Sequence, residues 1–306
     1  MGEQSNVPEK SVDEVINELR LRSMKLDIIW KIASAIAVIL PFVYVVLFIA
    51  QKLPAAIELI DHFIIALVLL VIIFVCVYML PMFLQINKNY KEYSNKYKSA
   101  YIKPILEEAF KGGDYDATDK VSLKELTEMS MLKKANSAVA NDCINGHYKG
   151  IKFKRFDLAL SYGKPSEASD CALIVCEMKT HLKGEIHIVN KQFKIGNTPY
   201  VVPEGLSEVS ITSDSFNKKF SVYAKDISEG KGFIAATLIK SLEKLKLGGP
   251  FVIIFERGKV YAVIRRKKDV MEAPLYATPS KKHAEKEATE EIEVIKDFIE
   301  MVHKDV

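Results

Sequence analysis

The chain has 306 residues, with 43 lysine and arginine residues against 39 aspartate and glutamate residues, which gives a formal net charge of +4. This length accommodates one or two modest domains beside a membrane segment. The small net charge argues against a dedicated nucleic-acid-binding protein, in which a clustered basic face is expected, so we predict no nucleic-acid partner. The four cysteines show no disulfide-framework spacing, which indicates a reducing compartment.

Residues 1–27 are predicted to form an N-terminal segment that contains an amphipathic helix. Apolar residues recur near one face from Ser11 to Lys25, and Ser11 with Glu14 matches a capping box. Such a helix can lie on a membrane surface, dock on the C-terminal domain, or simply extend the helix that follows. The sequence leaves these alternatives open.

Two long apolar runs, Ile28–Ala50 and Phe63–Phe83, dominate the next part of the chain. No residue is charged from Ile32 to the end of the first run, or anywhere in the second. A membrane-spanning helix needs about 20 mostly apolar residues, and backbone in lipid must satisfy its own hydrogen bonds. The sequence therefore predicts a transmembrane hairpin over residues 28–84.

The charges that flank this hairpin predict its orientation. Lysines and arginines precede the first run and follow the second, whereas the loop between them holds Lys52 as its only lysine or arginine. Because positive charge stays on the cytoplasmic side, we expect a multi-pass protein with both termini in the cytoplasm.

Residues 85–111 are predicted to form a juxtamembrane helix. Tyr90, Tyr93, Tyr97 and Tyr101 are spaced by three or four residues and so line one side, with lysines on the other. Tyrosine and lysine suit the headgroup region of a membrane, which makes Tyr90, Tyr93 and Tyr97 candidate lipid contacts. Packing on a partner helix explains the same spacing.

The residues after this helix carry oxygen side chains at several positions of a calcium-loop pattern, and the sixth position is Asp119 where such loops need glycine. A turn capped by Ser122 and Glu125, opening a helix to about Lys134, accounts for them equally well. We predict no metal here.

Residues 112–275 are predicted to form a cytoplasmic α+β domain with a mainly antiparallel sheet, because short connections favour antiparallel pairing. One strand, Ile151–Tyr162, changes phase at Lys154–Arg155, which suggests a bulge. The Arg257–Gly258 pair predicts a hairpin turn. The other predicted elements are a central strand Cys171–Met178, a neighbouring strand Gly184–Asn190, strands Glu208–Thr212 and Lys219–Ala224, a helix over 232–247, and the two hairpin strands within Phe251–Ile264.

A C-terminal amphipathic helix is predicted within residues 276–306. Its contact face consists of Ile292, Ile295, Ile299 and Val302. The complete prediction is thus a membrane-anchored α+β protein, in which a two-helix transmembrane hairpin precedes a cytoplasmic domain with packed helices.

Motifs for chemistry are scarce. The chain has no G-x-S-x-G, P-loop, G-x-G-x-x-G or H-E-x-x-H motif, so no catalytic residue and no cofactor are predicted. The step Gly230–Gly232, before a predicted helix start, is a weak candidate for a phosphate site. The basic run Arg265, Arg266, Lys267 and Lys268 is a further candidate for contact with anionic lipid, with a solvated strand end as the alternative.

One grouping resembles a zinc site. It combines Cys171, Cys176, His181 and His187, whose side-chain types all bind zinc. Their spacing differs from ordinary zinc knuckles, and two cysteines five apart on a strand face opposite ways. Buried cysteines and partly exposed histidines on neighbouring strands are the ordinary interpretation, and we predict no metal site.

The succession of segments resembles a bacterial family of uncharacterised membrane proteins, domain-of-unknown-function family three-one-three-seven. The resemblance covers roughly Tyr90 to Ile264. It implies two membrane helices followed by a cytoplasmic domain in the bacterial inner membrane, and it implies no activity. The matching segments are YIKPILEEAF, VSLKELTEMSML, NDCINGHYKGIKFKRFDLAL, HLKGEIHIVNKQF, FNKKFSVYAKD and FVIIFERGKVYAVI.

The leading functional hypothesis is a membrane-anchored interaction or scaffold domain, not an enzyme, whose partners are membrane lipids and another protein or a second copy of the chain. The alternative is a membrane-linked enzyme or binding protein for a small or lipid-derived ligand, which requires a pocket with converging polar groups. A third is a small transport or channel-forming subunit, although Lys31 is the only charge within the predicted helices. The polar candidates for a pocket are His181, His187, Glu177 and Asp157.

Overall fold

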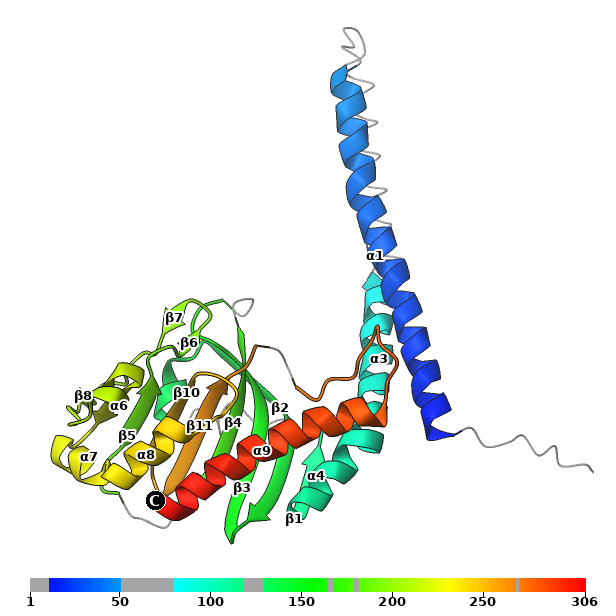
Figure 1. The fold of residues 1–306 in the computed structure, drawn as a ribbon. Coiled ribbons are helices and arrows are strands. Elements are labelled where there is room, and N and C mark those ends of the chain that lie inside the picture. The colour runs from blue at the N-terminus through cyan, green and yellow to red at the C-terminus, as the bar shows by residue number, and fades with distance from the viewer. Residues whose placement is uncertain (1–10, 51–79, 118–128, 165–167, 179–181, 268–269) are drawn as a thin grey trace, which may run out of the picture. The chain divides into compact units, whose positions relative to one another are not determined.

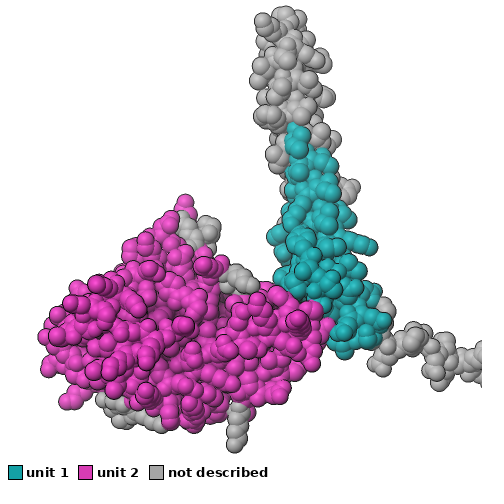
Figure 2. Space-filling model, viewed as in Figure 1, with its two compact units in different colours: residues 1–97, 273–279 teal, residues 98–272, 280–306 magenta. Residues whose placement is uncertain are grey.

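The computed structural model describes residues 11–50, 80–117, 129–164, 168–178, 182–267 and 270–306. These residues form two compact units (Figures 1 and 2). Unit 1 takes residues up to Tyr97 together with Ala273–Pro279, and unit 2 takes Lys98–Glu272 with Ser280–Val306. The C-terminal helix, expected as a separate segment, therefore belongs to the same unit as the sheet.

The predicted transmembrane hairpin is contradicted. Among the residues that the structure describes, no helix combines the length and the apolar character needed to cross a membrane. The first apolar run continues a helix that begins at Val12 and carries charged side chains over its first five turns, whereas a membrane span needs about 20 consecutive apolar residues. The predictions of a membrane-anchored fold and of a multi-pass inner-membrane protein with both termini cytoplasmic are therefore corrected. The second run lies outside the described residues except for its last four.

Within the described residues, unit 1 contains the paired helices α1 and α3 and the segment 273–279. Helix α1 spans Val12–Ala50 and α3 spans Leu80–Tyr97. The predicted capping box is confirmed, since the Ser11 N–H donates to the Glu14 carboxylate at 3.0 Å and the Glu14 N–H donates to Ser11 Oγ at 3.2 Å. The amphipathic N-terminal segment is thus the start of α1, which was one of the three alternatives.

The tyrosine side of α3 packs within unit 1. Tyr93 donates a hydrogen bond of 2.8 Å to the carbonyl oxygen of Pro274, and Tyr90 donates one of 3.4 Å to that of Ala273. Tyr93 and Tyr97 are completely buried. Hydroxyl donors at helical spacing therefore tie the segment 273–279 to α3.

Unit 2 is an antiparallel sheet with helices, which confirms the α+β part of the prediction. Within the described residues its main sheet has nine strands in the order β1-β2-β3-β4-β11-β10-β5-β9-β8, all pairs antiparallel. The strands are β1 (Lys111–Asp116), β2 (Ser137–Tyr148), β3 (Ile151–Ser161), β4 (Ser169–Glu177), β5 (Ile186–Asn190), β8 (Ser207–Glu208), β9 (Phe220–Ala224), β10 (Phe251–Glu256) and β11 (Lys259–Arg265), with β6 (Lys194–Ile195) and β7 (Thr198–Pro199) as a separate pair. The helices are the π-turn η2 (Lys98–Ile102), α4 (Lys103–Ala109), the 3₁₀ turn η3 (Ser130–Lys134), α6 (Asp214–Lys219), α7 (Ile227–Phe233), α8 (Ala236–Lys244) and α9 (Lys281–Asp305).

The C-terminal hairpin inserts between two strands that precede it in the chain. The predicted turn is confirmed, with Arg257 at φ 51° and Gly258 at φ 72°. Strand β11 pairs with β4, and β10 pairs with β5 (Figure 1). The prediction that β5 lies directly beside β4 is wrong, because the mostly apolar hairpin strands fill the centre of the sheet, where both faces are covered.

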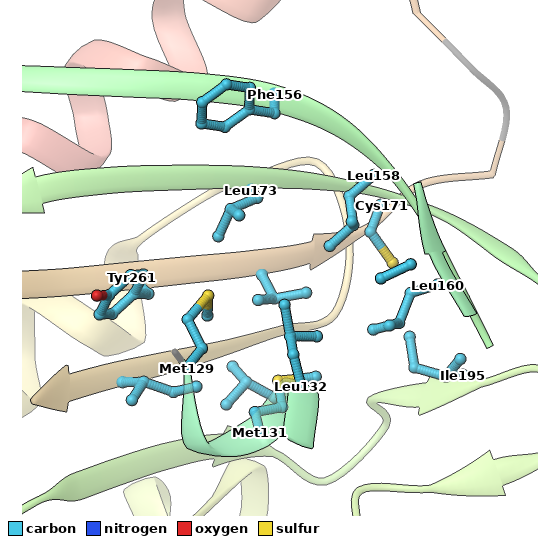
Figure 3. Packing of buried hydrophobic residues seen from close by; sticks show 14 of the residues in the cluster. Met129, Met131, Leu132, Phe156, Leu158, Leu160, Cys171, Leu173, Ile195 and Tyr261 are labelled. Atoms are coloured by element: carbon cyan, nitrogen blue, oxygen red, sulfur yellow. The ribbon is translucent and has the colours of Figure 1, made fainter. Parts of the chain in front are cut away.

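The two faces of this sheet have different covers. On one face, α8 and α9 lie side by side (Figure 1). On the other, η3 and the start of β6 cover the main apolar core, where Met131 and Leu132 meet Leu173 and Tyr261 from the strands (Figure 3). The predicted contact face of α9 is confirmed, since Ile292, Ile295, Ile299 and Val302 are all buried.

Strand β3 changes its apolar face half-way along, which explains the phase change in the sequence. Phe153 packs edge-on against Phe110 at 4.8 Å between ring centroids, whereas Phe156 and Leu158 enter the core on the opposite face. The pairing of β3 with β4 is continuous, so the bulge predicted at Lys154–Arg155 is wrong.

The irregularity lies instead on the partner strand β2. Its pairing with β3 shifts between Asn141 and Ile144, where Asp142 has φ 53°. Asp142 is fully buried and accepts hydrogen bonds from Lys98 Nζ at 2.8 Å and from Tyr115 OH at 2.5 Å. A buried carboxylate therefore accompanies the bulge, and its partners satisfy it.

A buried ion network fastens α9 to the sheet. Glu291 of α9 accepts a hydrogen bond of 2.7 Å from Arg155 Nε and another of 2.7 Å from Arg266 Nη2. Arg155 also donates to Asp157 at 2.7 Å. Arg155 and Glu291 are no more than 2% exposed, so the network is desolvated.

Helix α8 and its predecessor α7 replace the single helix predicted over 232–247. The chain leaves helical geometry at Ile234 and Ala235, and both Gly230 and Gly232 lie inside α7. They are therefore not at a helix start, and the phosphate-site candidate is removed. A Cβ on Gly230 would approach Ala224 Cβ to 2.8 Å, so close packing of helix on strand explains this glycine.

Candidate functional site

The most concentrated group of polar side chains surrounds His187 on β5. This imidazole is fully buried at the end of the apolar core. Its Nε2 lies 2.5 Å from Glu185 Oε1 and 3.2 Å from Ser130 Oγ, and its Nδ1 is hydrogen-bonded to the hydroxyl group of Tyr200. Strand alternation places His187 and Val189 on the core face, so the imidazole meets η3 and the segment after β7.

Aromatic packing fixes the hydroxyl group that faces Nδ1. The ring of Tyr200 stacks on that of Tyr223 with 6.4 Å between centroids, and the ring of Phe193 meets it edge-on at 6.4 Å. Burial raises the pKa of Tyr200, with smaller contributions from neighbouring acidic groups. Tyr200 therefore stays a phenol and donates its hydrogen to Nδ1.

The hydrogen bonds around His187 do not form a nucleophilic triad. Because Nδ1 accepts the hydrogen of the Tyr200 phenol, Nε2 carries the hydrogen of the neutral imidazole and donates it to Glu185. Ser130 approaches this same nitrogen, whereas a serine nucleophile needs a free imidazole lone pair and an acid on the opposite nitrogen. The arrangement orients the Glu185 carboxylate instead.

A second carboxylate, Glu256 at the end of β10, lies beside this group. It is 3% exposed and accepts a hydrogen bond of 3.3 Å from the backbone N–H of Ser130. Burial raises the pKa of Glu256, and the neighbouring charge of Glu185 raises it further. Glu185 thus lies close enough to Glu256 for its charge to disfavour the ionisation of Glu256.

Both carboxylates line a cavity of about 410 Å³ at the start of β5. The loop after β4, the loop before β8, the end of β9 and the β10–β11 turn form its walls. Basic side chains surround its opening, and the Glu229 carboxylate fixes its edge by accepting the N–H groups of Lys183 and Gly184 at 2.7 and 2.8 Å. The lining residues are Leu182, Lys183, Gly184, Glu185, Glu204, Gly205, Leu206, Lys225, Glu256 and Arg257.

The polar residues that the sequence singled out do not converge. Asp157 lies on the α9 face beside Arg155, Glu177 is exposed at the end of β4, and His181 lies outside the described residues. Of these residues only His187 belongs to the cluster, and its partners Glu185, Ser130 and Tyr200 are not part of any sequence motif. A signal was present, since Glu185-x-His187 at strand spacing places both side chains on one face.

The zinc grouping is likewise dispersed. Cys171 belongs to the apolar core on one face of β4, whereas Cys176 lies opposite Phe153. Burial raises the pKa of each thiol to about 12, so neither is a thiolate at neutral pH. In the described part of the chain, no three histidine, cysteine or carboxylate side chains are arranged to hold a metal ion.

The candidate lipid contacts remain predictions. Tyr93 and Tyr97 are buried and Tyr90 is half-buried, Arg266 is engaged by Glu291, Arg265 is half-buried and Lys267 is exposed. Lys268 lies outside the described residues. Of the oxygen side chains that match the calcium-loop pattern, those of Asp114 and Asp116 are within the described residues, and both belong to β1.

Comparison with known proteins identifies the region that contains this site. Residues 172–304 match the family model described as protein of unknown function (DUF3137). This match supports the DUF3137 family for the C-terminal part of the chain. The resemblance predicted from the sequence is thereby confirmed, whereas the two membrane helices expected with it are not. No curated protein matches the chain.

The DUF3137 region supplies most of the cavity and its surroundings, from β4 through α9. Among solved structures, the chain is similar to the crystal structure of the mycobacterial trehalose monomycolate transport factor A, TtfA, with a TM-score of 0.40 and 12% sequence identity. The alignment covers 66% of this chain and 92% of that one. A likeness of this size transfers no function.

Proposed function

We propose that unit 2 is a binding domain for a small polar ligand, which it receives in the cavity at the start of β5. The observation that carries this proposal is the Glu185 carboxylate, held from behind by a buried imidazole and presented toward a cavity of about 410 Å³. Ligand sites are commonly concave, with a few oriented polar groups, and this volume lies within their usual range of about 300–1,000 Å³.

Binding accounts for the cluster better than catalysis. The hydrogen on Nε2 is committed to Glu185, so Ser130 has no base, and both described cysteines of β4 are protonated. A rigid second layer of hydrogen bonds behind one carboxylate is what a selective binding site requires.

The test is ligand-observed NMR of the full chain with a panel of cationic, anionic, zwitterionic and neutral metabolites. We expect at least one class to bind, and we expect Leu206→Trp, which fills the cavity, to abolish that binding. Val139→Trp is the matched control, because Val139 is 55% exposed on β2, outside the cavity lining. Absence of binding, or equal binding to both variants, contradicts the proposal.

A second candidate function, an interaction or scaffold role through self-association, rests on an apolar stripe in unit 1. Ile28, Ile29, Ile32, Ile36 and Ile39 of α1 are between 42% and 56% exposed. Contiguous exposed apolar surface commonly marks an interaction site. From Ile29 onward the spacing of three or four residues places these side chains on one face, where two copies of the stripe can pack against each other, which favours a homo-oligomer.

Light scattering on the purified chain tests this role. We expect a dimer or larger oligomer that the double variant Ile32→Ser, Ile36→Ser converts to monomers, while Val12→Ser, another exposed apolar position of α1, leaves it intact. A wild-type monomer contradicts the role, and so does a stripe that binds lipid vesicles in place of a second copy.

A further inference from the structure

The inner wall of the cavity at the start of β5 is acidic. Glu256 is almost completely buried, and Ser130 is hydrogen-bonded to it through the backbone N–H and the side chain. No lysine or arginine in the described ranges lies within ion-pair distance of Glu256; the charge of Arg257 favours its ionised form, and the charge of Glu185 opposes it more strongly. Burying a carboxylate without a cation is costly, so this wall favours a positively charged occupant.

The opening of the same cavity is basic. Lys183, Lys225 and Arg257 are exposed and line it, and none of the three forms an ion pair with a described residue. Glu204 is the one acidic side chain among the exposed lining residues. The cavity is therefore polarised, with negative charge at its inner wall and an excess of positive charge at its opening.

We infer that the ligand is a small zwitterion, whose ammonium group lies between Glu185 and Glu256 and whose anionic group meets Lys225 and Arg257. This inference rests on the proposed binding function and specifies its ligand class. An ammonium group has three N–H donors, enough to reach both carboxylates, and its single charge offsets one of their two charges; charge-assisted hydrogen bonds of this kind are strong. A divalent metal ion fits less well, since the described residues hold no cluster of three suitable ligands.

The opposite charges at the two ends of the cavity also predict that a ligand with only one charged group binds weakly. An amine without an anionic group makes no ion pair with the basic side chains at the opening. A carboxylate without an amine is repelled by the two carboxylates at the inner wall. The separation of the two charges in the ligand must match the depth of the cavity, so affinity depends on the length of the chain that joins them.

Isothermal titration calorimetry of the full chain tests this with a homologous series, namely glycine, β-alanine, γ-aminobutyrate and 6-aminohexanoate. Butylamine and butyrate supply each charge alone. We expect affinity to peak at one chain length, with butylamine at least tenfold weaker than the best zwitterion and butyrate without measurable binding.

Three variants locate the binding. Glu256→Gln removes one negative charge at the inner wall without changing the size of the side chain. Lys225→Gln removes one positive charge at the opening. Because Lys225 is exposed, we expect this substitution to leave the fold unchanged. Each is expected to weaken the best zwitterion tenfold or more. Lys240→Gln, an exposed lysine of α8 outside the cavity, is the control and should leave affinity unchanged.

The outcomes separate this inference from the function on which it rests. Butylamine or butyrate binding as tightly as the best zwitterion overturns the zwitterion and leaves a binding domain. The zwitterion is also overturned, and the binding domain kept, if no member of the series binds but another metabolite does and Leu206→Trp abolishes that binding. Absence of any binding overturns both, and zwitterion binding that neither charge variant weakens places the ligand elsewhere and overturns the inference.

Discussion

Replacing Glu291 by glutamine tests whether the buried ion network holds α9 on the sheet. Glutamine preserves the shape of the side chain but removes the charge that faces two guanidinium groups, each at 2.7 Å. Removing one partner of a buried ion pair costs about 3–5 kcal/mol, because the remaining charge stays desolvated. Arg155 keeps Asp157 as a partner, so we expect the lower end, about 3 kcal/mol.

Urea unfolding of the full chain, followed by far-ultraviolet circular dichroism, measures this loss. With a urea dependence of about 1–3 kcal/mol per molar, the transition of unit 2 should move down by about 1–3 M. Trp30 is the single tryptophan of the chain, so its fluorescence reports unit 1 separately. Glu290→Gln is the matched control, because this neighbour is exposed and its pair with Lys286 spans 4.0 Å.

The same substitution has a signature in pH. Burial by itself raises the pKa of Glu291, but the charges of Arg155 and Arg266 outweigh it and lower the pKa below the ordinary 4.5. The stabilisation is therefore present above pH 4.5 and is lost as pH falls through the lower, folded-state value. Glu291→Gln should flatten this acid limb. A stability loss no larger than that of the Glu290→Gln control would refute the reasoning.

Three further substitutions probe the site and the core. Burial and Glu185 raise the pKa of Glu256, so the stabilisation associated with its protonated form is present below pH 4.5 and is lost as pH rises through the folded-state value. Glu256→Gln should remove this decline in urea titrations, and an unchanged pH profile contradicts it. Gly230→Ala should cost about 1–3 kcal/mol by overpacking, whereas Gly232→Ala in the same helix meets open space and should be neutral or stabilise by up to about 1 kcal/mol; equal effects in thermal unfolding would contradict the packing argument. Phe193→Ala should leave a core cavity and cost about 3–5 kcal/mol by the same measurement, and a loss under 1 kcal/mol would show that the core refills.

The sequence by itself determined the local elements. The capping box at Ser11 and Glu14, the Arg257–Gly258 turn and the contact face of α9 are all properties of residues close in the chain, and each is confirmed. Period and capping report on local backbone geometry, which tertiary packing here left unchanged. The antiparallel character of the sheet also followed, because short connections allow little else.

Only the tertiary structure decided which strands became neighbours. The hairpin β10–β11 separates β4 from β5, and no local pattern distinguishes that order from the sequential one. The phase change in β3 has the same origin, since Phe153 and Phe156 serve apolar contacts on opposite faces of one strand. Apolar alternation indicates which residues are buried but not which face of the strand is covered, so the phase change alone predicts a bulge that the structure does not have at this position.

The candidate site depended on the same long-range order. Ser130, His187, Tyr200 and Glu256 come from four segments of the chain and meet because β10 pairs with β5 and η3 covers their core face. Spacing along the sequence could have indicated Glu185 with His187, which lie two residues apart. The sequence does not indicate the remaining partners, because strand pairing and the packing of the apolar core bring them together. Once buried beside this core, the polar groups must form hydrogen bonds with each other.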